Sequence, residues 1–305
     1  AFDEVMAIGA NDVAKFDKAF FGHIGHIVNN LFRSVLLSVT RGGLASSPVS
    51  GSTARYYKKL AWASASFAIT TDIAMGALGG SLKFKKKITG RFADILSWMY
   101  IGTAVLRRYE AEGRRDEDLP FVHFAMNHAL YEMQKGFSNL FANLEVPGLT
   151  WFFSGPLRMW SNLNAFAEEA NDRHTHKIAS TILNNQDVRK RHSDGIYVPT
   201  NKDEQLAKLE HVFEVVKRAE ATDRKVRKAV KEKLIPKLKG SAASKAALEK
   251  GIITQDEFNE LAKADQLRWE AIQVDDFAEN EYVARKGFGP EHAKHQAELD
   301  RLRTS

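Results

Sequence analysis

Cysteine is absent from this 305-residue sequence, and its absence excludes several kinds of chemistry. A chain without cysteine has no disulfide framework, no thiolate zinc site and no cysteine nucleophile. The sequence also has no uncharged apolar run of the roughly 18 residues that a membrane-spanning helix needs, and no signal-peptide pattern at its start. It begins AFDEVMAIGAND without an initiator methionine, so we expect it to be a piece of a longer polypeptide.

Recognisable catalytic motifs are missing as well. The chain has no nucleophile elbow, no phosphate-binding glycine loop and no strand-turn-helix unit for a dinucleotide. The spacing of His23 and His26 suits two metal ligands on one helix face, but no carboxylate on the adjoining turn completes a site, so packing is favoured. The same packing role is expected for His123 and His128, and His174 and His176 point to different sides of a helix. We therefore predict no catalytic and no metal-binding residue here.

Helical periodicity is what the sequence has in abundance, since 44% of its residues are hydrophobic and they recur at intervals of three or four. Helices are expected at about 12–41, 54–78, 89–113 and 118–144, joined by short polar or glycine-rich turns. Candidate caps mark three of the starts: Asn11 or Asp12, Ser52 or Thr53, and Asp118 followed by Pro120. The fold class is therefore all-α, an antiparallel helix bundle in residues 1–145 followed by a smaller helical C-terminal unit.

The centre of the expected bundle is the stretch 72–110, in which Gly79 and Gly80 separate two apolar-faced helices. The helix before the turn is rich in small residues, which lets neighbouring helices approach closely, so we expect it to be an inner helix. The helix after the turn has a regularly spaced apolar face. That face comprises Phe92, Ile95, Leu96, Met99, Thr103 and Leu106.

Residues 146–203 are expected to hold an aromatic loop, a short helix at 171–183 and a turn-rich connection. The loop contains Trp151, Phe152, Phe153 and Trp160 around a Gly155-Pro156 break. One interpretation packs this loop onto the bundle. The other inserts its aromatic side chains into a membrane interface, where tryptophan is favoured.

The C-terminal unit is expected to span residues 204–283. One or two helices cover 204–234 and end before Pro236. A helical hairpin follows, in which Thr254 and Glu257 have the spacing of a capping box. Residues 284–305 are a charged tail, for which a terminal helix and a frayed end both remain open.

Basic residues are unevenly distributed in this chain of net charge +6. Eight of them lie in residues 224–239. A second cluster is a candidate partner surface, and it comprises Lys83, Lys85, Lys86, Lys87 and Arg91. Because aromatic interleaving and groove-reading motifs are missing, we expect no nucleic acid partner; a solvated helix face or an anionic membrane surface is favoured instead.

Several short motifs, kept in one order along the chain, together resemble a known family. They are GHIG at 22–25, RYYKKL at 55–60, LGGSLK at 78–83, RFADILSWMYIGTAVLRRYEAEGR at 91–114, DLPFVHFAMNHALY at 118–131, GIYVP at 195–199 and VDDF at 274–277. This set is similar to the C-terminal extension region of the large bacterial acyl-CoA dehydrogenases of fatty-acid β-oxidation. Lys87 and Gly90 depart from that resemblance, because an acidic residue and an alanine are usual there.

The resemblance implies a larger parent flavoprotein, in which an FAD site and a glutamate base would lie upstream of Ala1. That enzyme would remove α and β hydrogens from a fatty acyl-CoA. The resemblance further implies a homodimer and a peripheral position at the cytoplasmic side of the bacterial inner membrane. We expect the present segment to be inactive alone, to hold no cofactor and to stabilise the catalytic module or dimer.

An alternative of another class is a stand-alone helical adaptor that binds a protein or an anionic membrane and performs no catalysis. The two hypotheses differ in what the gene encodes before Ala1. A catalytic module there favours the dehydrogenase, whereas a start codon there favours the adaptor.

Overall fold

The computed structural model describes residues 2–169, 171–238 and 241–273, in which the regular elements are helices and no strand occurs. The all-α prediction is therefore confirmed. The chain divides into two compact units, residues 1–194 and 195–305, and each unit has its own hydrophobic core. The division falls within the stretch expected to connect two units. The VDDF motif and the charged tail 284–305 lie outside the described residues.

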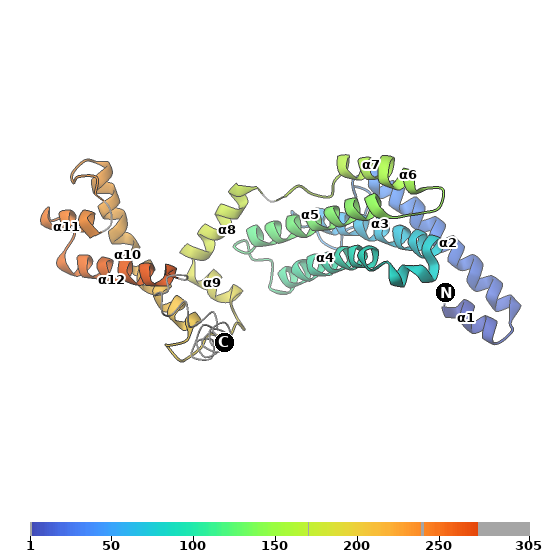
Figure 1. Ribbon diagram of the computed structural model, residues 1–305, viewed down its shortest axis with the longest axis horizontal. Helices are drawn as coiled ribbons and strands as arrows, with labels where there is room; N and C mark the ends of the chain where they lie inside the picture. The colour runs from blue at the N-terminus through green and yellow to red at the C-terminus, as the bar shows by residue number, and fades with distance from the viewer. Residues whose placement is uncertain (1, 170, 239–240, 274–305) are drawn as a thin grey trace, which may run out of the picture. The chain divides into compact units, whose positions relative to one another are not determined.

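The first unit is built on four long helices, α2 (Val13–Val39), α3 (Ala54–Leu78), α4 (Lys86–Ala111) and α5 (Leu119–Asn143), as Figure 1 shows. α2 packs on α3, α3 packs on α4, and α4 and α5 lie side by side for most of their length. The Asp12 carboxylate accepts a hydrogen bond from the backbone N–H of Lys15 and so caps α2 where the sequence predicted a cap. The helix-bundle prediction is confirmed.

The core of the bundle follows one face of α5. Its most enclosed side chains recur every three or four residues, as an inward helical face requires, and they are Met126, Leu130, Met133, Phe137 and Leu140. Gly136 lies on the same side of α5 and lets α4 come close, because a Cβ atom there would be 2.5 Å from Ile95 Cγ1.

The buried stripe of α4 differs in part from the predicted one. Phe92, Ile95 and Leu106 are buried as expected, but Leu96 is 52% exposed and Thr103 is exposed. Gly102 and Tyr109 are buried instead. Leu96 follows the buried Ile95 directly, and one residue turns the helix by about 100°, which carries its side chain out of the contact with α5.

Three features of the first unit were not predicted. A short α1 (Phe2–Gly9) precedes α2 and folds back against it after a turn at Asn11, which has a positive φ of 52°. A 3₁₀ helix, η1 (Gly79–Phe84), occupies the glycine turn. α9 (Gln186–His192) follows α8 (Asp172–Asn184), and its Val188 is fully buried.

The aromatic stretch is helical, so the prediction of a loop there was wrong. α6 (Thr150–Phe152), the π-helical turn η2 (Phe153–Leu157) and α7 (Arg158–Leu163) follow one another without a break. Pro156 lacks an N–H and was expected to break this stretch. The wider π turn accommodates the proline, and the helical path continues through it. Residues 150–163 are called the aromatic segment below.

The second unit contains α10 (Gln205–Lys231), α11 (Ser241–Glu249) and α12 (Gln255–Ile272). Thr254 and Glu257 form the predicted capping box at the start of α12, with both reciprocal hydrogen bonds present. α10 packs against α12 around Val215, Ala219 and Leu261.

Candidate functional site

The aromatic segment divides its four predicted contact residues between two environments. Trp151, Phe152 and Trp160 are 67%, 39% and 47% exposed, whereas Phe153 is only 3% exposed. Phe153 packs on Phe141 of α5, with ring centroids 6.2 Å apart. Phe153 is therefore part of the bundle core, and the other three side chains are on the outside.

Polar contacts attach the aromatic segment to α2 and α5. The Trp160 Nε1–H donates to Ser38 Oγ at 2.8 Å, and Asn164 Nδ2 donates to the Ser38 carbonyl oxygen at 2.6 Å. On the other side, Gln134 Nε2 donates to the Ser161 carbonyl oxygen at 3.0 Å. These hydrogen bonds attach the segment to α2 on one side and to α5 on the other.

The space left beneath the segment is the apolar groove, with a volume of about 480 Å³. Its floor comes from α3 and α5, and its two sides come from α2 and the aromatic segment. No charged residue is among its lining residues in the described structure. They include Leu31, Ser34, Val35, Ser38, Val39, Trp62, Ser66, Ile69, Thr70, Ile73, Gln134, Phe137, Phe141, Phe152, Trp160, Asn164 and Phe166.

The polar atoms of the groove are largely satisfied within its own wall. Thr70 Oγ1 donates to the Ser66 carbonyl oxygen at 2.7 Å, and the Ser34 and Ser66 hydroxyls are 3.5 Å apart. The Gln134 side chain, in addition to its bond to Ser161, accepts the Phe166 N–H at 3.2 Å. A wall whose polar groups are already paired presents mainly hydrocarbon to a ligand.

Lys59 lies beside one end of the apolar groove, and the charges of Arg41 and Arg55 are near enough to act on it. Lys59 Nζ donates to the carbonyl oxygen of Phe166, whose ring lies 4.3 Å from that of Trp62. Burial, together with the nearby charges of Arg55 and Arg41, lowers the pKa of Lys59. Within the described structure no carboxylate forms an ion pair with these three cations.

The same region contains His123, whose Nδ1 lies 2.8 Å from Tyr56 Oη. Arg55 in turn donates to Tyr56 Oη at 2.9 Å. Burial and the neighbouring Arg55, His174 and Lys177 lower the pKa of His123. Positive charge from Arg55 of α3 and Lys177 of α8 therefore surrounds His123 and favours its neutral form.

The basic turn, defined as Lys83, Lys85, Lys86, Lys87 and Arg91, is at the start of α4. Lys85 Nζ is 2.6 Å from Glu145 Oε2, and this hydrogen bond lowers the pKa of Glu145. Lys83, Lys86 and Lys87 are exposed, and Phe84 between them is 81% exposed. Because Glu145 shortly precedes the aromatic segment, the ion pair places the basic turn near the start of that segment.

The basic stretch in the second unit is different, because α10 and α12 supply acidic partners. Lys217 and Arg224 pair with Glu220 and lower its pKa to about 2, and Lys225 pairs with Glu257. Arg227 and Lys228 pair with acidic residues of α10 or its cap in the same way. This stretch is therefore a mixed-charge helix surface.

Most apolar side chains of α2 are unburied. Leu37 and Asn30 are the only buried residues of this helix, and α1 covers just one part of it. Figure 1 shows the first half of α2 extending beyond the other long helices, with α1 beside it. The large side chains that remain at least 36% exposed on α1 and α2 are Phe2, Val5, Met6, Ile8, Val13, Phe20, Phe21, Ile24, Val28, Leu31, Phe32, Val35, Leu36 and Val39.

His23, His26 and His128 make hydrogen bonds or ring contacts with neighbouring side chains. His23 Nδ1 is 3.1 Å from Glu4 Oε1, and His26 Nε2 is 2.9 Å from Asn30 Nδ2. His128 packs edge-to-face against Trp98. The described residues contain no group of three potential metal ligands, and none of their helices is long and apolar enough to cross a membrane.

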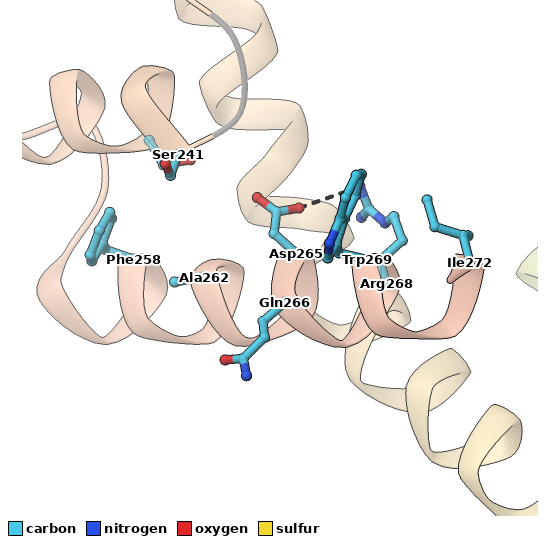
Figure 2. Close-up of a pocket in the computed structure, with 9 residues that line it drawn as sticks. Ser241, Phe258, Ala262, Asp265, Gln266, Arg268, Trp269 and Ile272 are labelled. Atoms are coloured by element: carbon cyan, nitrogen blue, oxygen red, sulfur yellow. Dashed lines mark ion pairs between the residues drawn. The ribbon is translucent and has the colours of Figure 1, made fainter. Parts of the chain in front are cut away.

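A shallow pocket in the second unit lies between α11 and α12 (Figure 2). Asp265 and Arg268 form an ion pair of 3.4 Å at its edge, and Trp269 beside them is 64% exposed. Gln266 points away from Ser241, on the opposite side of α12 from Asp265 (Figure 2). With its one carboxylate already paired, this pocket shows no arrangement for catalysis.

Comparison with known proteins identifies the chain through one family. No solved structure was found to match it. Residues 1–277 match the family described as "Acyl-CoA dehydrogenase, C-terminal, bacterial type". The match covers both units and nearly all described helices. The chain therefore belongs to the bacterial-type C-terminal family of acyl-CoA dehydrogenases, as its ordered motifs indicated.

Proposed function

We propose that this chain is the helical C-terminal region of an FAD-dependent enzyme that dehydrogenates fatty acyl-CoA. In this proposal it stabilises the catalytic module or the dimer and helps to hold the enzyme at the cytoplasmic side of the inner membrane. The family supports the dehydrogenase assignment, and the surfaces of the first unit support the two auxiliary roles.

The flavin is assigned to the upstream module because the apolar groove does not suit it. A flavin dinucleotide carries a charged pyrophosphate, which proteins bind with free backbone N–H groups or cations inside the site. The groove instead has an uncharged lining whose polar atoms bond one another. No residue of this chain is therefore given a catalytic role.

The exposed apolar face of α1 and α2 carries the proposal of a stabilising role. Monomeric proteins rarely expose a contiguous apolar patch of more than a few hundred Å². Fourteen large apolar side chains exposed on two packed helices form a surface suited to contact with the catalytic module or a second subunit.

This role is testable in the complete enzyme by placing charges on that face. We expect Phe21→Asp with Val28→Asp to lower the melting temperature of the enzyme or to shift its dimer towards monomer. Tyr100→Asp is the matched control, because Tyr100 is 76% exposed on α4, away from this face. If the double variant keeps the dimer and the melting temperature of the control, the face does not stabilise the enzyme.

Membrane association is supported by the outward side of the aromatic segment and by the basic turn. Trp151 and Met159 are 67% and 63% exposed, and the Lys85–Glu145 ion pair keeps the lysines nearby. Aromatic side chains favour the membrane interface, and each surface lysine adds about 1 kcal/mol of attraction to anionic lipid.

Vesicle flotation tests this second role. We expect the wild-type enzyme to float with phosphatidylglycerol vesicles, and Trp151→Ala with Met159→Ala to remain in the dense fraction. Trp269→Ala is the control, because it removes an equally exposed tryptophan from the second unit. Equal flotation of all three proteins would remove the aromatic segment from the membrane contact.

A further inference from the structure

The apolar groove has the two parts of a ligand site, a closed floor and an open edge. Ile69, Phe137 and Phe141 on its floor are 8%, 1% and 6% exposed. At its edge, Val35 of α2 is 54% exposed and Trp160 of the aromatic segment is 47% exposed. A molecule can therefore enter between α2 and the aromatic segment without unfolding the core.

The shape of the groove follows the helices that line it. On α3 its lining runs from Trp62 to Ile73, which corresponds to about 16 Å along the axis at 1.5 Å per residue. Its volume of about 480 Å³ is roughly three times that of a 150 Å³ apolar cavity able to bind benzene. These dimensions suit a flexible chain better than a single ring.

Charge marks one end of the groove. Lys59 lies three residues before Trp62 on the same side of α3, and Arg41 follows Val39 at the end of α2. Lys59 is bonded to the carbonyl oxygen of Phe166, which itself lines the groove. The charges of Arg41 and Arg55 act unfavourably on that of Lys59, and an anion beside Lys59 would relieve this repulsion.

We propose that the apolar groove binds the hydrocarbon chain of one long-chain anionic amphiphile, a fatty acid or a phospholipid, with its head group beside Arg41, Arg55 and Lys59. The uncharged wall accepts the chain, because its polar atoms are paired and burying hydrocarbon there releases water. The cation cluster accepts the carboxylate or phosphate. This site is separate from the flavin site of the parent enzyme and does not depend on membrane association.

Titration of the complete enzyme with hexadecanoate carrying a ¹³C-labelled carboxyl group tests the proposal in the absence of vesicles. We expect the intensity of the bound carboxylate resonance to saturate at one equivalent of hexadecanoate per chain. Val35→Trp fills the edge of the groove and is expected to raise the dissociation constant of hexadecanoate about tenfold or more, a change of about 1.4 kcal/mol. Leu96→Trp is the control, since Leu96 is 52% exposed on α4 and does not line the groove.

The head-group position has its own pair of variants. Arg41→Gln removes one cation of the cluster and is expected to weaken hexadecanoate binding two- to fivefold, as loss of an exposed charge contact of up to about 1 kcal/mol implies. It should also shift the bound ¹³C resonance. Arg33→Gln, within α2, should change neither the dissociation constant of hexadecanoate nor the bound ¹³C resonance.

Two sources of the ligand are separated by a second arm, in which the enzyme is incubated with phosphatidylglycerol vesicles, re-purified and extracted for mass spectrometry. Recovery of one phospholipid that Val35→Trp abolishes identifies a membrane lipid as ligand, whereas hexadecanoate binding alone identifies a free fatty acid. Either result supports the site. Binding that does not saturate overturns it, and so does saturable binding that is equally strong in Val35→Trp and Leu96→Trp. A Val35→Trp variant whose sole change is lost dimerisation also overturns it, since the groove then holds protein.

Discussion

The contact between α4 and α5 is closest at Gly136, and adding one methyl group there is a sharp test of the packing. In Gly136→Ala the new Cβ would lie 2.5 Å from Ile95 Cγ1, about 1 Å inside the ordinary contact distance between carbon atoms. Ile95 is fully buried, so this inner atom of its side chain has little room to move away.

The net effect combines two opposing contributions. Overpacking a closed core costs about 1–3 kcal/mol, and alanine in place of glycine within a helix returns up to about 1 kcal/mol. We therefore expect Gly136→Ala to lower the free energy of unfolding of the first unit by about 1 kcal/mol, and by no more than about 2. Without the close contact the same change would be stabilising.

Denaturant unfolding followed by tryptophan fluorescence measures this change. A Trp269→Phe background removes the tryptophan of the second unit, so the remaining signal comes from residues 1–194. Gly76→Ala is the matched control, because Gly76 is helical in α3 with no atom within 4 Å of an added Cβ, and it should stabilise by about 0.5–1 kcal/mol.

A double-mutant cycle identifies the cause. In an Ile95→Ala background the obstructing Cγ1 is gone, so Gly136→Ala should become stabilising, with a coupling of about 1–3 kcal/mol. If Gly136→Ala stabilises the wild-type bundle as much as Gly76→Ala does, the helices are farther apart than described and the argument is refuted.

Three further predictions concern other parts of the chain. Burial and Arg55 lower the pKa of His123 below 6.5, so the unfolded chain binds a proton that the folded bundle does not. The free energy of unfolding should therefore fall as the pH decreases from 6.5. His123→Gln should flatten this pH dependence in melting curves. Thr254→Ala should lower the stability of the second unit by about 1 kcal/mol, with Thr254→Ser near wild type in the same denaturant assay. Asp118→Ala removes the carboxylate 3.0 Å from Arg191, so trypsin should cleave α9 faster than in wild type, and an unchanged rate would argue against that anchor.

Local signals in the sequence were sufficient for most helix boundaries. The Asp12 cap of α2 and the capping box of α12 depend on neighbours three residues away, so a linear pattern contains the needed information. Thr53 directly precedes α3, but its side chain makes no capping hydrogen bond. The Gly155-Pro156 pair is the exception. Its breaker signal is equally local, but contacts of Trp160 and Phe153 with distant helices favour a helical segment there.

The candidate sites were less predictable because they depend on contacts between distant parts of the chain. The pattern of α2 correctly gives an apolar face, but a pattern does not say whether anything covers that face. Likewise, Arg41 and Lys59 are unremarkable as single residues, and their proximity follows from the antiparallel packing of α2 and α3. The aromatic residues were identified from sequence, whereas the separation of Phe153 from its exposed neighbours required the fold.

The uncovered apolar face of α1 and α2 also bears on how a cell handles this polypeptide. Chaperones and quality-control proteases recognise exposed hydrophobic surface, and they act on a native chain that displays it much as they act on an incompletely folded one. A copy whose face stays uncovered would be retained by chaperones or degraded, and a copy that finds its contact would escape both. Where a second subunit provides that contact, quality control of this kind would remove the copies that fail to dimerise.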